Sequence, residues 1–115
     1  MANEKFGSIQ VSNQIVEQIV AESALKTNGV YKVIGYANQK FEKYNKDALS
    51  ISDSDGEKEI TICIVVNSDS TVIEVAENVQ KNIASEIYSM LRLNVNKINV
   101  IVKSIHYVSQ DWLYP

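Results

Sequence analysis

A single stretch decides the fold: residues 71–105, which read TVIEVAENVQKNIASEIYSMLRLNVNKINVIVKSI. Its first part spaces apolar side chains three or four residues apart, which predicts an amphipathic helix packed on a sheet. Thr71 and Glu74 form a capping-box pattern at the helix start, and Asn94 is expected to end the helix. Residues 97–108 then alternate in polarity, with both faces apolar enough for an interior strand. The apolar stripe of the helix comprises Ile73, Ala76, Val79, Ile83, Ile87 and Met90.

The rest of the chain adds a second helix and further strands. Ser12 is a suitable N-cap for a helix that Asn28 and Gly29 end, because glycine readily adopts the left-handed conformation found just past a helix. Residues 53–56, DSDG, have the composition of a turn and join two strands as a hairpin. The strands expected in this part of the chain are residues 7–11, 30–34, 48–51 and 59–66.

This order of elements predicts an α+β fold. We expect a two-layer sandwich, in which two helices cover one face of a mostly antiparallel sheet, and we prefer a split β-α-β topology of the ferredoxin-like kind. Residues 1–115 are expected to form one domain, with residues 1–5 flexible and residues 109–115 as an aromatic C-terminal tail. The sheet face without helices is a candidate surface for self-association, as in a homo-oligomer, or for binding another protein.

The composition is that of an ordinary globular protein. The chain has 115 residues, of which 45% are hydrophobic and 22% charged, with a net charge of −3. Its lone Cys63 cannot form an internal disulfide and lies in an apolar strand pattern, which suits a small buried side chain in a reducing compartment. No signal-peptide core and no apolar run of about 20 residues occurs. We therefore expect a cytoplasmic protein with no membrane span.

Side chains suited to catalysis or metal binding are scarce. His106 is the sole histidine, and no cysteine lies at ligand spacing from it, so zinc is not expected. Residues 53–56 are similar to part of a calcium loop, but Ile51 and Ile62 occupy positions that require oxygen ligands. Neither a nucleophile elbow nor a glycine-rich phosphate loop occurs. The sequence predicts no enzyme and no cofactor, although a concave site around His106 would reopen that question.

Several short motifs recur in a characteristic order along almost the whole chain, from Gly7 to Ile105. They are Gly7-Ser8-Ile9-x-Val11, Ile19-Val20-Ala21-x-x-Ala24, Gly29-Val30, Val75-Ala76-x-x-Val79-Gln80, Met90 and Ile98-Asn99-Val100-x-Val102. Together they resemble the alkaline shock protein family, the Gls-type envelope stress response proteins of Gram-positive bacteria. The chain departs from the family at Asn67-Ser68, where a Tyr-Gly pair is frequent, and at Leu91-Arg92, where Thr-Gly is frequent.

This resemblance implies a function rather than a reaction. Proteins of the family are non-enzymatic, cytoplasmic and linked to cell-envelope homeostasis, and some are held near the membrane by a separate anchor protein. The resemblance therefore implies a protein-interaction module whose partners include a membrane-anchored envelope protein.

Four residues are candidates for protein binding. Asn78 and Gln80 lie beside the apolar stripe of the second predicted helix, although a polar shoulder on such a helix needs no function. Trp112 and Tyr114 belong to the C-terminal tail, and exposed aromatic side chains often anchor interfaces.

The alternative hypothesis is a small RNA-binding α+β module. Its candidate residues alternate basic and aromatic side chains, which could neutralise phosphates and stack on bases. The net charge of −3 and the lack of a Gly-x-x-Gly clamp make nucleic acid the weaker hypothesis, and a solvated connector is the simpler interpretation of the segment. The residues concerned are Lys40, Phe41, Lys43, Tyr44 and Lys46.

Overall fold

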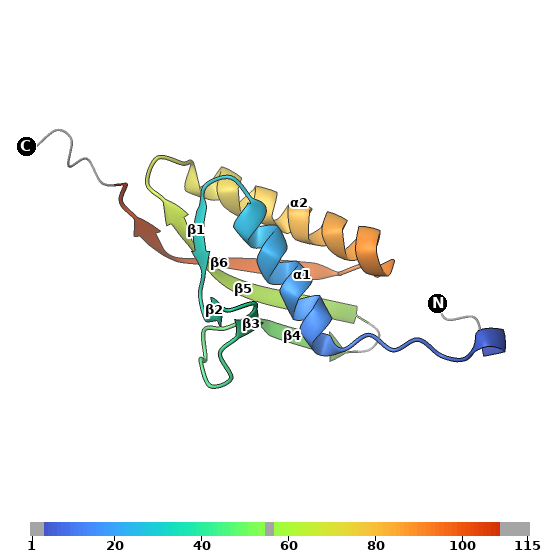
Figure 1. The fold of residues 1–115 in the computed structure, drawn as a ribbon. Coiled ribbons are helices and arrows are strands. Elements are labelled where there is room, and N and C mark those ends of the chain that lie inside the picture. The colour runs from blue at the N-terminus through green and yellow to red at the C-terminus, as the bar shows by residue number, and fades with distance from the viewer. Residues whose placement is uncertain (1–3, 55–56, 109–115) are drawn as a thin grey trace, which may run out of the picture.

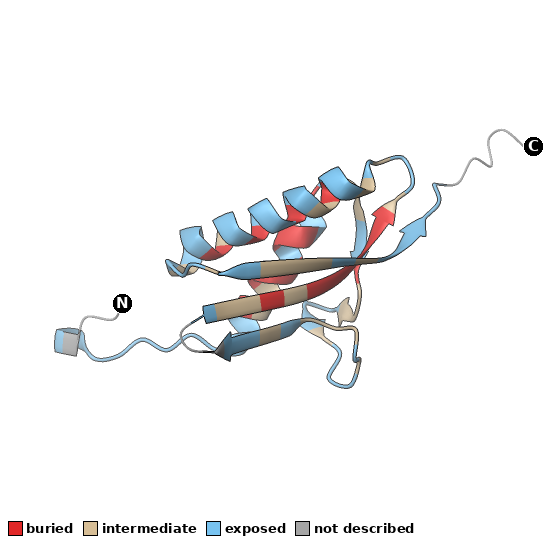
Figure 2. Cartoon of the chain, turned by 180° about the vertical axis from the view of Figure 1, so that it is seen from behind, coloured by how far each residue is buried: buried red, intermediate tan, exposed pale blue. Residues whose placement is uncertain are grey.

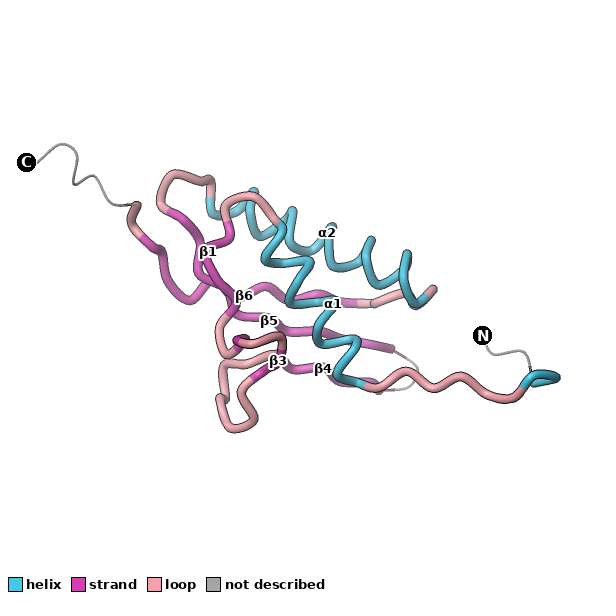
Figure 3. Tube along the Cα trace, in the orientation of Figure 1, coloured by secondary structure: helices cyan, strands magenta, loops and turns pink. Residues whose placement is uncertain are grey.

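Two helices cover one face of a sheet in the computed structural model of the chain, which describes residues 4–54 and 57–108 (Figure 1). The helices and the sheet form two layers, and Figure 3 shows the loops that join them. In chain order the elements are the 3-10 turn η1 (Glu4–Phe6), α1 (Asn13–Lys26), β1 (Val30–Val33), β2 (Tyr36–Ala37), β3 (Lys40–Phe41), β4 (Ser50–Ser54), β5 (Glu57–Asn67), α2 (Val72–Leu91) and β6 (Lys97–His106).

Strand β5 is the centre of the main sheet. On one side it pairs in parallel with β6, from Glu59 opposite Lys97 to Asn67 opposite His106. On the other side β4 and β1 pair with it in antiparallel fashion, one after the other along its length. The short strands β2 and β3 form a separate hairpin. Strand β6 therefore lies at an edge, and the prediction of an interior strand is wrong for the part of the chain that the structure describes.

The core lies between the sheet and the helices, and every second residue of β5 contributes to it. Figure 2, seen from behind, shows the buried residues concentrated on β5 and on the inner sides of both helices. Helix α2 crosses the sheet beside β6, and α1 packs against both α2 and β1. The buried core comprises Val16, Ile19, Val20, Ala24, Val33, Ile60, Ile62, Ile64, Val66, Val75, Val79, Ile83 and Ile87.

The predicted fold class is confirmed, with a difference at the N-terminus. The chain forms an α+β two-layer sandwich of the ferredoxin-like kind, and the hairpin of β4 and β5 is present. The parallel strands β5 and β6, which α2 joins, pair directly with each other, so no strand splits this β-α-β unit as the preferred topology expected. Residues 7–11, however, form no strand, and Ile9 is 75% exposed. Two apolar residues in alternation are too short a pattern to specify a strand. In addition, β5 already pairs with β6 on one side and with β1 and β4 on the other, so it has no free edge for a further strand.

The helix ends differ in detail from the predictions. Ser12 and Thr71 occupy the N-cap positions, but neither side chain makes a capping hydrogen bond, so the capping box is wrong. Helix α2 ends at Leu91, before Asn94, because Arg92 adopts the left-handed conformation at φ 57°. Gly29 has a positive φ of 97°, but α1 has already ended at Lys26, where Thr27 turns to extended backbone.

Three residues of the predicted stripe on α2 lie outside the core, and one of them, Ala76, is half-buried. Ile73 is 68% exposed. Two positions along an α-helix correspond to a rotation of about 200°, so Ile73 lies nearly opposite the buried Val75. Met90 is exposed at the last turn, beyond the buried Ile87. The buried face of α2 is instead Val75, Val79, Ile83 and Ile87.

Candidate protein interface

The open edge of the sheet carries a row of exposed apolar side chains. Strand β6 pairs only with β5 among the described residues, so its other edge presents unpaired backbone groups. Ile101 is 44% exposed and Tyr107 is 76% exposed, and Tyr31 of β1 is exposed nearby. We call this region the β6 surface and define it as Tyr31, Ile101, Ile105, His106, Tyr107 and Val108.

A stacked ring pair fixes one end of the β6 surface. The rings of Tyr31 and His106 lie with their centroids 3.8 Å apart and an angle of 11° between their planes. Because β1 and β6 flank β5, this stack crosses the central strand on the helix-free face. Figure 2 looks onto that face. The stack gives His106 a packing role, and the described residues contain no group of three or more potential metal ligands.

The backbone at the end of β6 and just beyond it is hydrogen-bonded to the loop before α2. The Ser68 backbone N–H donates to the carbonyl oxygen of His106 at 2.9 Å, and the Ser68 hydroxyl accepts a hydrogen bond from the N–H of Val108 at 3.0 Å. These two bonds hold the backbone on both sides of Tyr107 while its ring stays exposed. Tyr107 is therefore presented on a fixed backbone.

The middle of the helix-free face is partly covered. Lys103 of β6 forms an ion pair with Asp47 of the loop before β4, at 3.7 Å between Nζ and Oδ1. Cys63 of β5 is 6% exposed, and its burial, together with the Asp47 carboxylate, raises the pKa of its thiol. The prediction that Cys63 is a small buried side chain is confirmed, and its depressed thiolate fraction makes it a poor nucleophile.

Gln80 has a structural role. Its side-chain amide donates to the carbonyl oxygen of Ile98 at 2.9 Å and so links α2 to the start of β6. Asn78 lies exposed on α2. Trp112 and Tyr114, the other two candidates for protein binding, lie outside the described residues.

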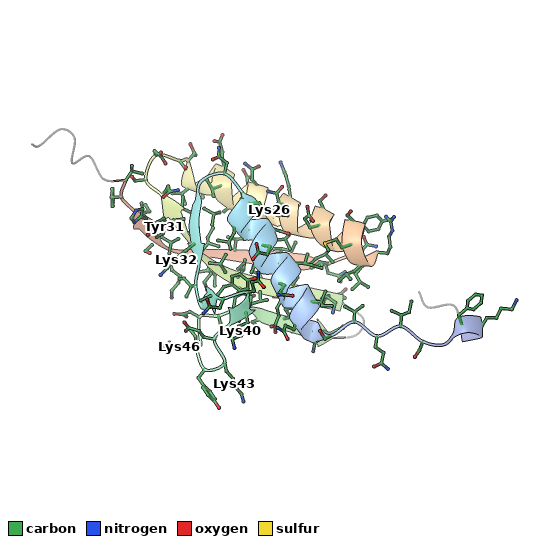
Figure 4. The ribbon with its side chains drawn as sticks, in the orientation of Figure 1. Lys26, Tyr31, Lys32, Lys40, Lys43 and Lys46 are labelled. Carbon is green, nitrogen blue, oxygen red and sulfur yellow. The ribbon has the colours of Figure 1, made fainter. Side chains whose placement is uncertain are left out.

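The five residues proposed for RNA binding differ in how exposed their side chains are. Phe41 packs against the hydrophobic core, with its ring centroid 4.9 Å from that of Tyr36, so it is not available to stack on a base. Tyr44 is 89% exposed, and the ammonium of Lys43 lies 5.5 Å from its ring centroid. Lys40 and Lys46 are both exposed, Lys40 in the β2–β3 hairpin and Lys46 in the loop that follows it (Figure 4).

A cavity of about 360 Å³ lies between α1, the end of α2 and the β2–β3 hairpin. The Tyr36 hydroxyl donates to Glu22 at 2.8 Å there, and burial, with the hydrogen bond to Glu22 and its charge, raises the pKa of Tyr36 to about 12. The Ser23 hydroxyl is committed to the carbonyl oxygen of Ile19 at 2.6 Å. The cavity is thus lined by two carboxylates, Glu22 and Glu86, and a neutral phenol, and its one hydroxyl-bearing serine is already hydrogen-bonded.

Sequence reasoning missed the residues of the β6 surface. The signal was present, since residues 97–108 are apolar on both faces, but this pattern is also typical of an interior strand. An edge strand whose outer side chains remain apolar is the other arrangement compatible with that pattern, and such an edge requires a partner or protection.

Comparisons with known proteins identify the fold. No curated protein matches the chain. A solved manganese form of a MamM CTD variant superposes with a TM-score of 0.57 at 19% identity, covering 81% of this chain and 99% of that chain. A nickel form of another MamM CTD variant gives a TM-score of 0.55 at 19% identity, covering 84% and 99%. At this identity the likeness is one of fold alone.

None of the helices within residues 4–54 and 57–108 is long and apolar enough to cross a membrane.

The family of the chain follows from its sequence. A model of the alkaline shock protein 23 family, described by a cell envelope-related function, matches residues 1–107. The resemblance to the alkaline shock proteins is thereby confirmed. The chain belongs to the alkaline shock protein 23 family, and its function is related to the cell envelope.

Proposed function

We propose that the chain is a non-enzymatic protein-interaction module that supports cell-envelope homeostasis by binding a protein partner through the β6 surface. The observation that carries this proposal is the open edge of a ten-residue strand with exposed apolar side chains beside it. Such edges are ready to accept a further strand, and exposed aromatic and aliphatic side chains are typical anchors of interfaces.

The partner is proposed to add a strand to the second half of β6. Gln80 already occupies the carbonyl oxygen of Ile98, which leaves the later part of the edge for pairing. Ile101 and Tyr107 would then supply the apolar contacts on either side of the added strand. The two hydrogen bonds made by Ser68 already fix the backbone at this end of the strand, so binding requires little further ordering of that backbone.

The proposed partner is an envelope protein anchored in the membrane, with the chain itself in the cytoplasm. The family's envelope-related function supports this choice. A second copy of the chain is the other protein that this edge could pair with, because identical edges can join across a two-fold axis. The non-enzymatic part of the proposal is supported by the structural use of polar groups that could otherwise act in catalysis, including His106, Cys63 and Ser23.

The test is affinity capture from the membrane and soluble fractions of the native host, with identification of the bound proteins. The double variant Ile101→Lys/Tyr107→Lys should lose the specific partner, since two charges would enter the contact. The matched control is Ile73→Lys, at an exposed apolar residue on the far side of α2. Light scattering of the same proteins reports self-association. Unchanged capture and unchanged mass of the double variant would contradict the proposal.

A further inference from the structure

The charge of this chain is unevenly distributed. Residues 30–49 contain four lysines and two carboxylates, a net charge of +2, whereas the whole chain carries −3. Figure 4 shows Lys43 and Lys46 on the projecting loop that follows β3, Lys40 in the hairpin beside it, and Lys32 farther along on β1. We call the exposed part of this region, Lys40, Lys43, Tyr44 and Lys46, the basic tip.

The carboxylates near the basic tip are engaged with other groups. Glu42 accepts a hydrogen bond from the Asn45 side chain at 3.1 Å. Asp47 is paired with Lys103, and its backbone N–H donates to the side-chain oxygen of Asn45 at 2.9 Å. Lys40, Lys43 and Lys46 form no ion pair within the described part of the chain. Their charge is therefore directed outward from a loop whose shape Asn45 helps to fix.

The aromatic side chain of the basic tip is as exposed as its lysines. Tyr44 is 89% exposed, and Lys43 lies against its ring. A tyrosine flanked by lysines on a projecting loop has the composition of a membrane-interface contact, in which the ring settles among headgroups while the ammonium groups meet phosphates. Figure 3 shows this loop projecting from the sheet after β3.

We propose that the basic tip docks on the anionic phospholipid headgroups of a membrane surface. The acidic remainder of the molecule is repelled by such a surface, so the lysines near the tip would orient the protein, since charges act within about 10 Å at moderate salt. This contact is separate from the β6 surface and goes beyond the proposed protein binding. It would place the chain at the membrane without a spanning helix.

The same lysines could meet the phosphates of RNA, but the geometry favours the membrane. Binding of a single strand requires several aromatic side chains along a groove. Phe41 is committed to the core, which leaves Tyr44 as the one exposed ring of the segment 40–46. A projecting loop presents its charges to a flat surface, and the envelope-related function of the family agrees with that surface.

The experiment is co-sedimentation of the full chain with vesicles made of equal parts phosphatidylglycerol and phosphatidylcholine, at low salt. The triple variant Lys40→Gln/Lys43→Gln/Lys46→Gln should bind about 100-fold more weakly, because each lysine contributes about a factor of five at an anionic surface. The control Lys26→Gln/Lys81→Gln/Lys97→Gln makes the same change in net charge elsewhere and should bind like the unmodified protein. Circular dichroism verifies that both variants are folded.

Three outcomes of these binding measurements would overturn the proposal. An equal loss in both triple variants would mean that only net charge matters, and undiminished binding to pure phosphatidylcholine would exclude headgroup charge. Retention of a single-stranded oligouridine without vesicle binding would instead favour RNA. In support, the Tyr44→Ala variant should lose several-fold in vesicle binding even where added salt has weakened the lysines, and inorganic phosphate at matched ionic strength should not compete.

Discussion

At the scale of single residues, Tyr36 shows how the fold sets the chemistry of a side chain. Its hydroxyl donates to Glu22 and its ring packs against Phe41, so one residue joins α1 to the β2–β3 hairpin. Burial comes first among the causes that raise its pKa from 10.0 to about 12, followed by the hydrogen bond to Glu22 and the negative charge of that carboxylate. All three favour the neutral phenol.

This shift predicts a loss of stability at alkaline pH. Because the folded-state pKa is raised above the unfolded value, the stabilisation is fully present below pH 10 and is lost as the pH rises from 10 through 12. The unmodified protein should exceed Tyr36→Phe by about 1 kcal/mol in free energy of unfolding at neutral pH, given that the group is partly exposed. Urea unfolding at a series of pH values measures the gap, which should close by pH 12. A gap that stays constant across this range would contradict the assignment.

At the scale of elements, the connection between α1 and β1 is closely constrained by its neighbours. Gly29 follows the end of α1, and its backbone C=O accepts a hydrogen bond from the N–H of Asn67, the last residue of β5. A β-carbon at this position would lie 2.5 Å from Cγ2 of Val75 and 2.8 Å from the Ser70 hydroxyl. Both the positive φ and the close approach therefore require glycine.

We expect Gly29→Ala to lower the free energy of unfolding by about 2–3 kcal/mol, since it combines an unfavourable φ with overpacking against α2. The matched control is Gly7→Ala, where φ is +100° but nothing lies within 4 Å of the added carbon. Because Gly7 sits in an exposed segment, its substitution should cost less than about 1 kcal/mol. Chemical denaturation compares the two, and equal losses would refute the role of the contact with Val75.

The elements also show which parts of the fold could be predicted from the sequence. The presence of helix α2 and of the β4–β5 hairpin was predicted correctly, because the spacing of apolar residues along α2 and β5 indicates which side chains share a face, whereas the cap and the end of α2 were not. The strand expected at residues 7–11 rested on Ile9 and Val11 alone, and whether such a pair forms a ladder depends on a free neighbouring edge. That information lies in the tertiary arrangement.

The candidate interface was harder to predict for the same reason. Polarity alternation along β6 does not reveal which edge of a strand remains unpaired, so Ile101 and Tyr107 gave no local signal of exposure. Gln80 was predicted only as a candidate for protein binding, and its hydrogen bond to Ile98 could not be foreseen because it depends on how α2 crosses β6. The exposure of Tyr44 and the partial burial of Phe41, three residues apart, likewise depend on the path of the loop.

At the scale of the whole molecule, the core unites both helices with the sheet. Each of α1, α2, β1 and β5 contributes fully buried or nearly buried side chains to one cluster. Loss of any of these elements would expose the apolar side chains of the others. Such a core favours a single cooperative unfolding transition.

Cys63 provides a probe of this cooperativity. Its thiol is buried in the middle of the sheet, and it is the only cysteine of the chain. We expect labelling by a disulfide reagent to be slow in the folded protein and to become fast over the same range of urea in which the far-ultraviolet circular dichroism is lost. Labelling well below that range would show that the loop around Asp47 opens independently. Asp47→Asn serves as the comparison, since it weakens the ion pair with Lys103 on the same face.

The parallel pairing of β5 with β6 also has a consequence for the growing chain. Residues that face each other across this ladder, such as Glu59 and Lys97, are 38 positions apart. At synthesis rates of roughly 5–20 residues per second, β5 waits about two to eight seconds before its partner has been made. During that interval the most apolar strand of the protein has a bare edge on the ribosome, and the helix made in between is the first element able to shield it.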